Sequence, residues 1–113
     1  MQYAELASPT AAEASAAIRA RVNAARARQH GRFAGTPIPH NAAMGVRELR
    51  RYCPLAPPEQ QLLAQAMRHY GLSARAHDRI CKVARTIADL AGTAEITAAH
   101  VAEAIQYRTL DRQ

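Results

Sequence analysis

The chain has 113 residues, a net charge of +6 and 49% hydrophobic residues, and arginine carries nearly all of the positive charge. This length allows one domain with a modest core, and the predominance of alanine over large apolar residues favours an all-α bundle with close helix contacts. Because no run of alternating β-branched residues is bounded by turn signals, no β-sheet is expected.

Residues 1–10 show little pattern and are expected to form a flexible lead-in to a helical domain over 11–113. Thr10 and Glu13 fit a capping box, so the first helix is predicted over 11–30. The apolar residues of this helix form a narrow seam of Ile18, Val22 and Ala25. Arginines follow both edges of this seam: Arg19 and Arg26 on one edge, and Arg21, Arg28 and Arg32 on the other.

The arginines of this helix have two interpretations. Their stems can cover the seam while the guanidinium groups reach water, or some of them can contact phosphates. The positive charge favours an anionic partner such as nucleic acid, a nucleotide or an acidic protein surface, but arginine-rich composition also accompanies high-GC coding. The spacing alone does not decide between these interpretations.

Glycines and prolines interrupt the pattern between residues 31 and 41, which predicts a loop. A short helix is predicted over 45–52, starting at Asn41 or Gly45. The residues expected to face inward are Val46, Leu49 and Cys53, and those expected to face outward are Arg47, Arg50 and Arg51.

A third helix is predicted over 58–70, because prolines suit the first positions of a helix and Gly71 follows its last turn. Its inward face is expected to consist of Leu62, Leu63, Ala66, Met67 and Tyr70. A last helix, capped by Thr97, is predicted over 97–107, with an inward face of Val101, Ala102, Ile105 and Leu110.

The most strongly patterned helix is predicted over 73–91, between the cap residue Ser73 and the terminating Gly92. Its apolar face is expected to consist of Ile80, Val83, Ala84, Ile87, Leu90 and Ala91. The five helices are expected to pack as a compact bundle around it. Arg75 lies in its first turn, where a cation is mildly unfavourable for the helix itself. Arg75 therefore either contacts something outside the helix or simply reaches solvent.

The sequence contains neither a Gly-x-x-x-x-Gly-Lys-Ser/Thr loop nor a His-Glu-x-x-His pair, so no self-sufficient enzyme and no metal site are expected. Cys53 and Cys81 are far apart in sequence and are interpreted as small buried residues in a reduced cytoplasm. Cys81 has no base predicted beside it. Without an apolar run long enough to span a bilayer, the protein is expected to be cytoplasmic, with no membrane partner.

Several separate stretches resemble the C-terminal domain of magnesium-chelatase-like AAA+ ATPases, with the ComM (YifB-type) competence family as the nearest branch. The resemblance covers about residues 13–112, in the expected order. The matching stretches are Gly71-Leu-Ser-Ala-Arg75 with the helix that follows, then 83–92, 100–108, 18–29, 41–44 and 47–53.

The resemblance implies that the chain is the helical lid of a larger ATPase, whose P-loop, Walker B and arginine-finger segments would precede residue 1, so that Met1 would not be the native start. Arg75 matches the second-sensor arginine, which would contact the γ-phosphate of ATP bound with Mg²⁺ by the core domain of the same polypeptide. Arg79, one turn further on, would support that site. His77 stands where the family often has an aromatic residue, and Asp78 also departs from the usual choice.

The parent protein implied by this family is a hexameric, ATP-driven DNA branch-migration motor of natural transformation, with neighbouring subunits and DNA as partners. The fragment alone is expected to bind no cofactor. Two alternatives belong to different classes: a subunit-contact module, and a basic helical module that binds DNA. The residues proposed for DNA binding are Arg19, Arg21, Arg26, Arg28, Arg47, Arg50 and Arg51.

Overall fold

The computed structural model describes the backbone of residues 9–111 and the side chains of residues 14–108. Its elements are α2 (Pro9–Arg32), the 3₁₀ turn η1 (Asn41–Ala43), α3 (Val46–Tyr52), α4 (Pro57–Tyr70), α5 (Ala74–Ala91) and α6 (Ala98–Asp111). Every regular element of the described residues is helical, which confirms the predicted all-α bundle of five helices. The predicted helix ends are correct to within two residues, except that α6 continues to Asp111.

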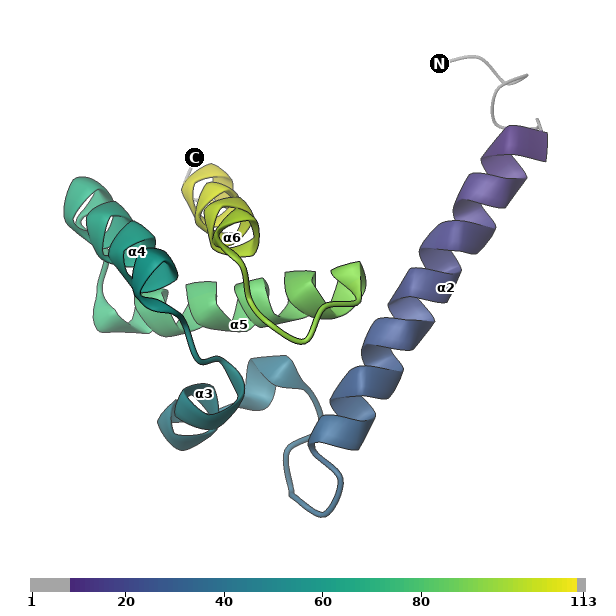
Figure 1. The fold of residues 1–113 in the computed structure, drawn as a ribbon, viewed down its shortest axis with the longest axis horizontal. Coiled ribbons are helices and arrows are strands. Elements are labelled where there is room, and N and C mark those ends of the chain that lie inside the picture. Colours follow the sequence, from purple (N-terminus) through teal and green to yellow (C-terminus); the bar gives the residue numbers. More distant parts are fainter. Residues whose placement is uncertain (1–8, 112–113) are drawn as a thin grey trace.

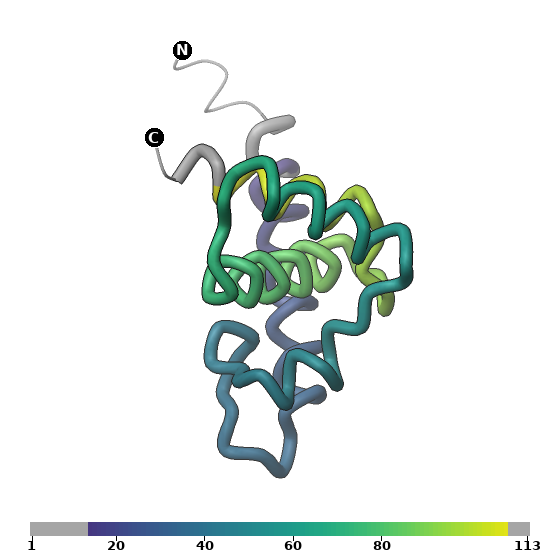
Figure 2. The backbone as a smooth tube through the Cα atoms, turned by 90° about the vertical axis from the view of Figure 1, so that its left-hand side faces the viewer, coloured from purple at the N-terminus to yellow at the C-terminus, as the bar shows by residue number. Residues whose placement is uncertain are grey.

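Helix α5 is the centre of the fold. It contacts α2, α3, η1 and α6, and α4 packs against α6 on one side of it (Figure 1). Turned by 90°, the chain shows α5 between the α4–α6 pair and the segment that contains η1 and α3 (Figure 2). The expectation that the helices pack around the most strongly patterned one is confirmed for α2, α3 and α6, whereas α4 packs mainly against α6.

Local signals fix both ends of α5. The Ser73 hydroxyl accepts a hydrogen bond of 3.2 Å from the Ala76 N–H, which satisfies one of the free donors of the first turn. At the other end Gly92 adopts the left-handed conformation, with φ of 78°, and its N–H bonds to the last turn. Thr97 likewise caps α6, because its hydroxyl accepts from the His100 N–H and its own N–H donates to the His100 ring.

The core lies where α5 meets the other helices. Ala84 and Ala88 are completely buried there, so the helix axes can approach closely, as the alanine content predicts. The chain's single Phe, Phe33, closes one end of the core and meets the Tyr52 ring edge-on, with 5.4 Å between centroids. The remaining large core residues are Met44, Leu49, Leu63, Ile80, Ile96, Val101 and Ile105.

Helix α2 differs from the prediction. Only its C-terminal part packs on α5, and its N-terminal part projects away from the bundle (Figure 1). Ile18 is 52% exposed and Ala25 is buried, so the predicted seam is wrong at its first residue. Because the helix already begins at Pro9, Thr10 is not its cap; the Thr10 and Glu13 side chains and residues 1–8 of the predicted lead-in lie outside the described parts.

Several residues predicted to face inward are exposed: Val46, Tyr70, Val83, Ala91 and Ala102. Val46 and Tyr70 occupy the first position of α3 and the last position of α4, where a helix leaves the core. Leu110 lies outside the described side chains. Both proposed starts for the short helix have a role, because Asn41 begins η1 and Gly45 caps α3.

Candidate functional site

The N-terminal end of α5 presents the predicted sensor arginine. Gly71, with φ of 63°, ends α4 and turns the chain so that Ser73 can cap α5. Arg75 follows in the first turn, and its side chain is exposed. Among residues 14–108, no hydrogen bond or ion pair engages its guanidinium group. A cation on a rigid, capped helix end is thus available to an external anion.

Arg79 lies one turn after Arg75 and is also exposed, so the structure brings the two predicted cofactor-contacting residues onto one face of α5. Between them, the buried Ala76 faces the core. The two guanidinium groups could therefore contact one phosphate-bearing ligand. The side chains described here contain no group of three or more His, Cys, Asp or Glu that could hold a metal ion.

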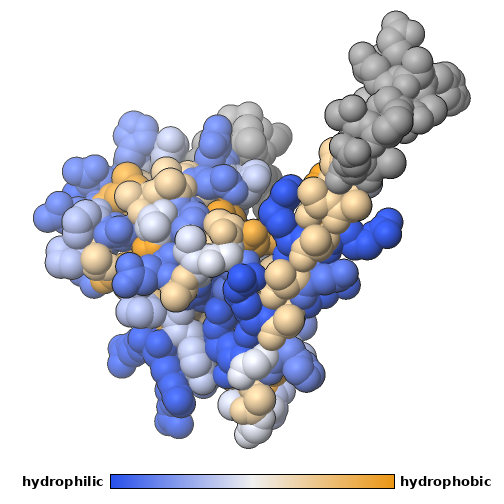
Figure 3. Space-filling view, turned by 45° about the vertical axis from the view of Figure 1, so that its right-hand side comes forward, coloured by the Kyte–Doolittle hydropathy of each residue, from blue (hydrophilic) through white to orange (hydrophobic). Residues whose placement is uncertain are grey.

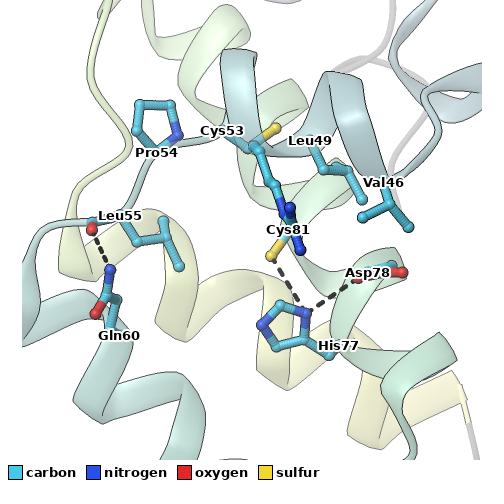
Figure 4. Close-up of a pocket in the computed structure, with 10 residues that line it drawn as sticks. Val46, Leu49, Cys53, Pro54, Leu55, Gln60, His77, Asp78 and Cys81 are labelled. Carbon is cyan, nitrogen blue, oxygen red and sulfur yellow. Dashed lines mark hydrogen bonds and ion pairs between the residues drawn. The ribbon is translucent and has the colours of Figure 1, made fainter.

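A pocket of about 670 Å³ lies beside this helix end, between α3 and α5 (Figure 4). In this pocket a base lies beside Cys81, which was not predicted: the His77 Nδ1 is 4.0 Å from the Cys81 Sγ. The same Nδ1 lies 3.2 Å from the Asp78 carboxylate, so the three groups do not form a relay through both ring nitrogens.

The thiols of this pocket are not activated. Burial raises the pKa of Cys81 to about 11 and that of Cys53 to about 12. A thiol with such a pKa is almost entirely protonated at neutral pH and is a poor nucleophile. Both cysteines are free and buried, which confirms their interpretation as small core residues.

The arginines proposed for DNA binding lie on two helices, α2 and α3. Arg19, Arg21 and Arg26 are exposed along α2. Arg28 instead reaches the far end of α5, where it donates a hydrogen bond of 3.2 Å to the carbonyl oxygen of Asp89. The arginines of α3 are exposed, and the Arg51 guanidinium lies 5.1 Å from the centroid of the Tyr52 ring.

A buried charged network near the C-terminal end of α5 was not predicted. Asp89 is completely buried, and Arg32 binds both of its carboxylate oxygens, at 2.6 and 2.9 Å. The Asn41 side-chain amide donates to the same carboxylate at 2.9 Å, and the Arg85 Nε lies 3.5 Å from it. The network therefore joins α2, η1 and α5.

The partners of Asp89 decide its charge state. Burial alone would raise the pKa of Asp89, but the hydrogen bonds from Arg32 and Asn41 and the charges of both arginines outweigh burial and hold that pKa below its usual value. Arg32 responds in the opposite sense, since its hydrogen bond to Asp89 raises its pKa. The carboxylate is therefore ionised at neutral pH.

We expect the free energy of unfolding to fall on acidification because of this carboxylate. Its folded-state pKa is depressed, so the stabilisation is complete above the unfolded-state pKa of about 3.9 and is lost as the pH falls through the folded-state value. Urea unfolding of the wild-type chain and of Asp89→Asn at about pH 6 and about pH 3 measures the effect. The wild-type chain should lose more stability than the variant over this interval, and equal losses would contradict the assignment.

Sequence contained one signal for the network. Arg85 and Asp89 are spaced i, i+4 within an otherwise apolar face, where two solvated charges would be out of place.

No helix among the described residues has the length and apolarity required to cross a bilayer.

The sequence of the chain matches a known protein family and several of its members. The family described as "Magnesium chelatase, subunit ChlI C-terminal" matches residues 12–108. Protein YifB of Salmonella typhimurium is 41% identical over 100 residues, covering 88% of this chain and 19% of that protein. YifB of Escherichia coli is 42% identical over the same length, with the same coverage.

The competence protein ComM of Haemophilus influenzae is 44% identical over 72 residues, covering 64% of this chain and 14% of that protein. No solved structure matches the chain. The chain thus spans about a fifth of the length of its YifB relatives, 19% in each. Since the family match covers nearly all of the described helices, this chain belongs to the magnesium chelatase subunit ChlI C-terminal family.

Proposed function

We propose that this chain is the C-terminal lid domain of an AAA+ ATPase, in which Arg75 contacts the γ-phosphate of ATP bound by a core domain of the same polypeptide. One observation carries the proposal: Arg75 is an exposed cation without a partner among the described side chains, held on the capped end of the central helix. Its position in Leu72-Ser-Ala-Arg75, which resembles the family's second-sensor motif, and the membership of the chain in this family support the proposal.

The side-chain chemistry suits this role. The planar guanidinium group stays charged and offers a fork of donors that matches phosphate oxygens, and Arg79 on the same face adds a second charge. When bound, ATP with Mg²⁺ supplies the phosphoryl group that is transferred. Arg75 would stabilise the charge that develops on that group, and loss of the contact after hydrolysis would release α5 and the helices packed on it.

The likeness to ComM extends the proposal to the parent protein, which we infer to be a hexameric, ATP-driven motor for DNA branch migration in natural transformation. Its subunit neighbours and DNA would then be partners, and Mg²⁺ ligands would come from the core domain. The exposed arginines of α2 and α3 support a DNA partner. A role limited to subunit contacts would instead appear as a change in oligomeric state when this domain is removed from the full-length protein.

Replacing Arg75 by alanine in the full-length protein should lower ATP turnover about 100-fold, because a donor aimed at the developing charge is lost. Turnover with saturating ATP measures the change, and the exposed Arg68 of α4 gives the matched control Arg68→Ala. Both variants should unfold within about 0.5 kcal/mol of the wild-type protein, since both side chains are exposed. Unchanged turnover in a folded Arg75→Ala protein would reject the sensor assignment.

A further inference from the structure

An arginine-lined groove lies at the end of α5 that is remote from Arg75. It has a volume of about 560 Å³ and is bounded by the C-terminal part of α2, the end of α3 and the segment after α5. In the space-filling view, strongly hydrophilic side chains fill the region between α2 and the body of the domain (Figure 3). Four arginines line the groove, and no carboxylate does: Arg28, Arg32, Arg51 and Arg85. Tyr52 and Thr93 also line it.

The charges in the groove are not balanced. Among the side chains of residues 14–108, the one carboxylate that forms an ion pair with its arginines is Asp89, which is completely buried and faces Arg32 and Arg85. Both oxygens of Asp89 already accept hydrogen bonds from Arg32 and Asn41. Asp89 therefore neutralises at most one of the four guanidinium charges, and the groove keeps a net positive charge in a partly enclosed space.

Part of this charge has a structural role. Arg85 is 4% exposed and donates to the carbonyl oxygens of Tyr52 and Ala94, at 3.2 and 3.0 Å. Arg28 is exposed and uses one terminal nitrogen to donate to the carbonyl oxygen of Asp89, so its other donors stay available to a ligand. Cations at a helix C-terminus satisfy free carbonyl groups in this way. The position of Arg51 has no such explanation, because its only contact among the described side chains is the ring of Tyr52.

The positive surface continues past Arg51. A second hollow of about 330 Å³ shares Arg51 and Tyr52 with the groove and adds Arg47 on its other side. Glu48 also lines this hollow; its carboxylate accepts a hydrogen bond of 2.7 Å from the Gly45 N–H and offsets one of the two arginine charges there. Arginines thus line both spaces, and Arg51 is common to them.

We propose that this groove binds the phosphate backbone of a nucleic-acid strand, with Arg28 and Arg51 as its main contacts and Arg47 extending the path. Successive arginines fit a chain of phosphates, because each guanidinium group can bind one phosphate through two donors. The Tyr52 ring is partly buried against the core and meets Phe33 edge-on, and the contact of Arg51 with this ring positions the guanidinium group at the groove. This inference deepens the DNA-facing part of the proposed function and rests on it.

The groove and the sensor arginine can be tested separately. Residues 75 and 92 are 17 positions apart on or next to one helix, which places them about 25 Å apart along its axis. Binding of an oligonucleotide to the 113-residue chain requires no ATP. Failure of the groove would therefore leave the Arg75 assignment untouched, and the reverse is also true.

The test is fluorescence anisotropy of a labelled single-stranded DNA of about 16 nucleotides, titrated with the chain at several salt concentrations. Arg51→Glu should weaken binding about tenfold at low salt and reduce the slope of log K against log salt by about one. Arg28→Glu/Arg51→Glu should weaken it further. The matched control is Arg68→Glu, which reverses one exposed charge on α4 and should change affinity less than about twofold.

Four results would overturn the proposal: no binding by the wild-type chain at low salt, equal losses in Arg51→Glu and Arg68→Glu, equal competition by inorganic phosphate at the same phosphate concentration, or equal competition by polyglutamate. The second would mean that bulk charge binds the strand, and the third that the groove holds single phosphates. Equal competition by polyglutamate would likewise assign the groove to acidic protein segments. Because Arg51 makes no hydrogen bond among the described residues, the Arg51→Glu chain should remain folded, and circular dichroism checks this.

Discussion

Replacing Asp89 by alanine should lower the free energy of unfolding by about 3–5 kcal/mol, a large share of the stability of a domain of this size. The carboxylate is completely buried and faces two guanidinium groups, so its removal leaves Arg32 and Arg85 charged and without a counter-ion. Urea unfolding of the 113-residue chain measures the loss. The control is Asp78→Ala, whose carboxylate is partly exposed and should cost less than about 1 kcal/mol.

A second variant separates the value of the network from the cost of breaking it. Replacing Arg32, Arg85 and Asp89 together by methionine or leucine removes all three charges, and should recover most of the stability lost in Asp89→Ala. A loss below about 1 kcal/mol in Asp89→Ala would show that the network contributes little, and would contradict the central place we give it.

The parts of the fold that sequence predicts are those with local causes. Ser73, Gly71 and Gly92 act within one turn of their own positions, through a hydroxyl that meets a free N–H or through a left-handed backbone. The ends of α5 were therefore predicted correctly. The cap of α2 was not, because the helix already begins at Pro9, before the predicted Thr10 capping box.

The charged network could not be predicted because its cause is not local. Arg32 and Asp89 are 57 residues apart in the sequence. Asn41 lies where the loop after α2 enters η1, and the path of this loop depends on its contacts with α2. The Asn41 N–H donates a hydrogen bond of 2.9 Å to the side-chain oxygen of Gln29, which ties the end of that loop to α2. Sequence analysis therefore left Arg32 as either a solvated flank residue or a phosphate contact, although it is the closest partner of a buried carboxylate.

The candidate sites divide in the same way. Exposure of Arg75 follows from its place in the first turn of a patterned helix, and sequence was sufficient to single it out. The groove is different, since Arg28 and Arg51 belong to separate helices and meet only because the network docks α2 against α5. Both were proposed from the sequence as phosphate contacts. The sequence does not indicate that they share one groove, or that Arg19 and Arg50 lie outside it.

Replacing Ile80 by alanine should cost about 2–5 kcal/mol, whereas Val83→Ala should cost less than about 1 kcal/mol. Sequence periodicity placed both on the inward face of α5, but Ile80 is 2% exposed and Val83 is 38% exposed. The difference arises because Arg85 and Asp89 occupy core-facing positions, which turns the buried face toward Cys81 and away from Val83. Equal losses in urea unfolding would mean that α5 is rotated from the position described here, and Arg75 and the groove would then face other directions.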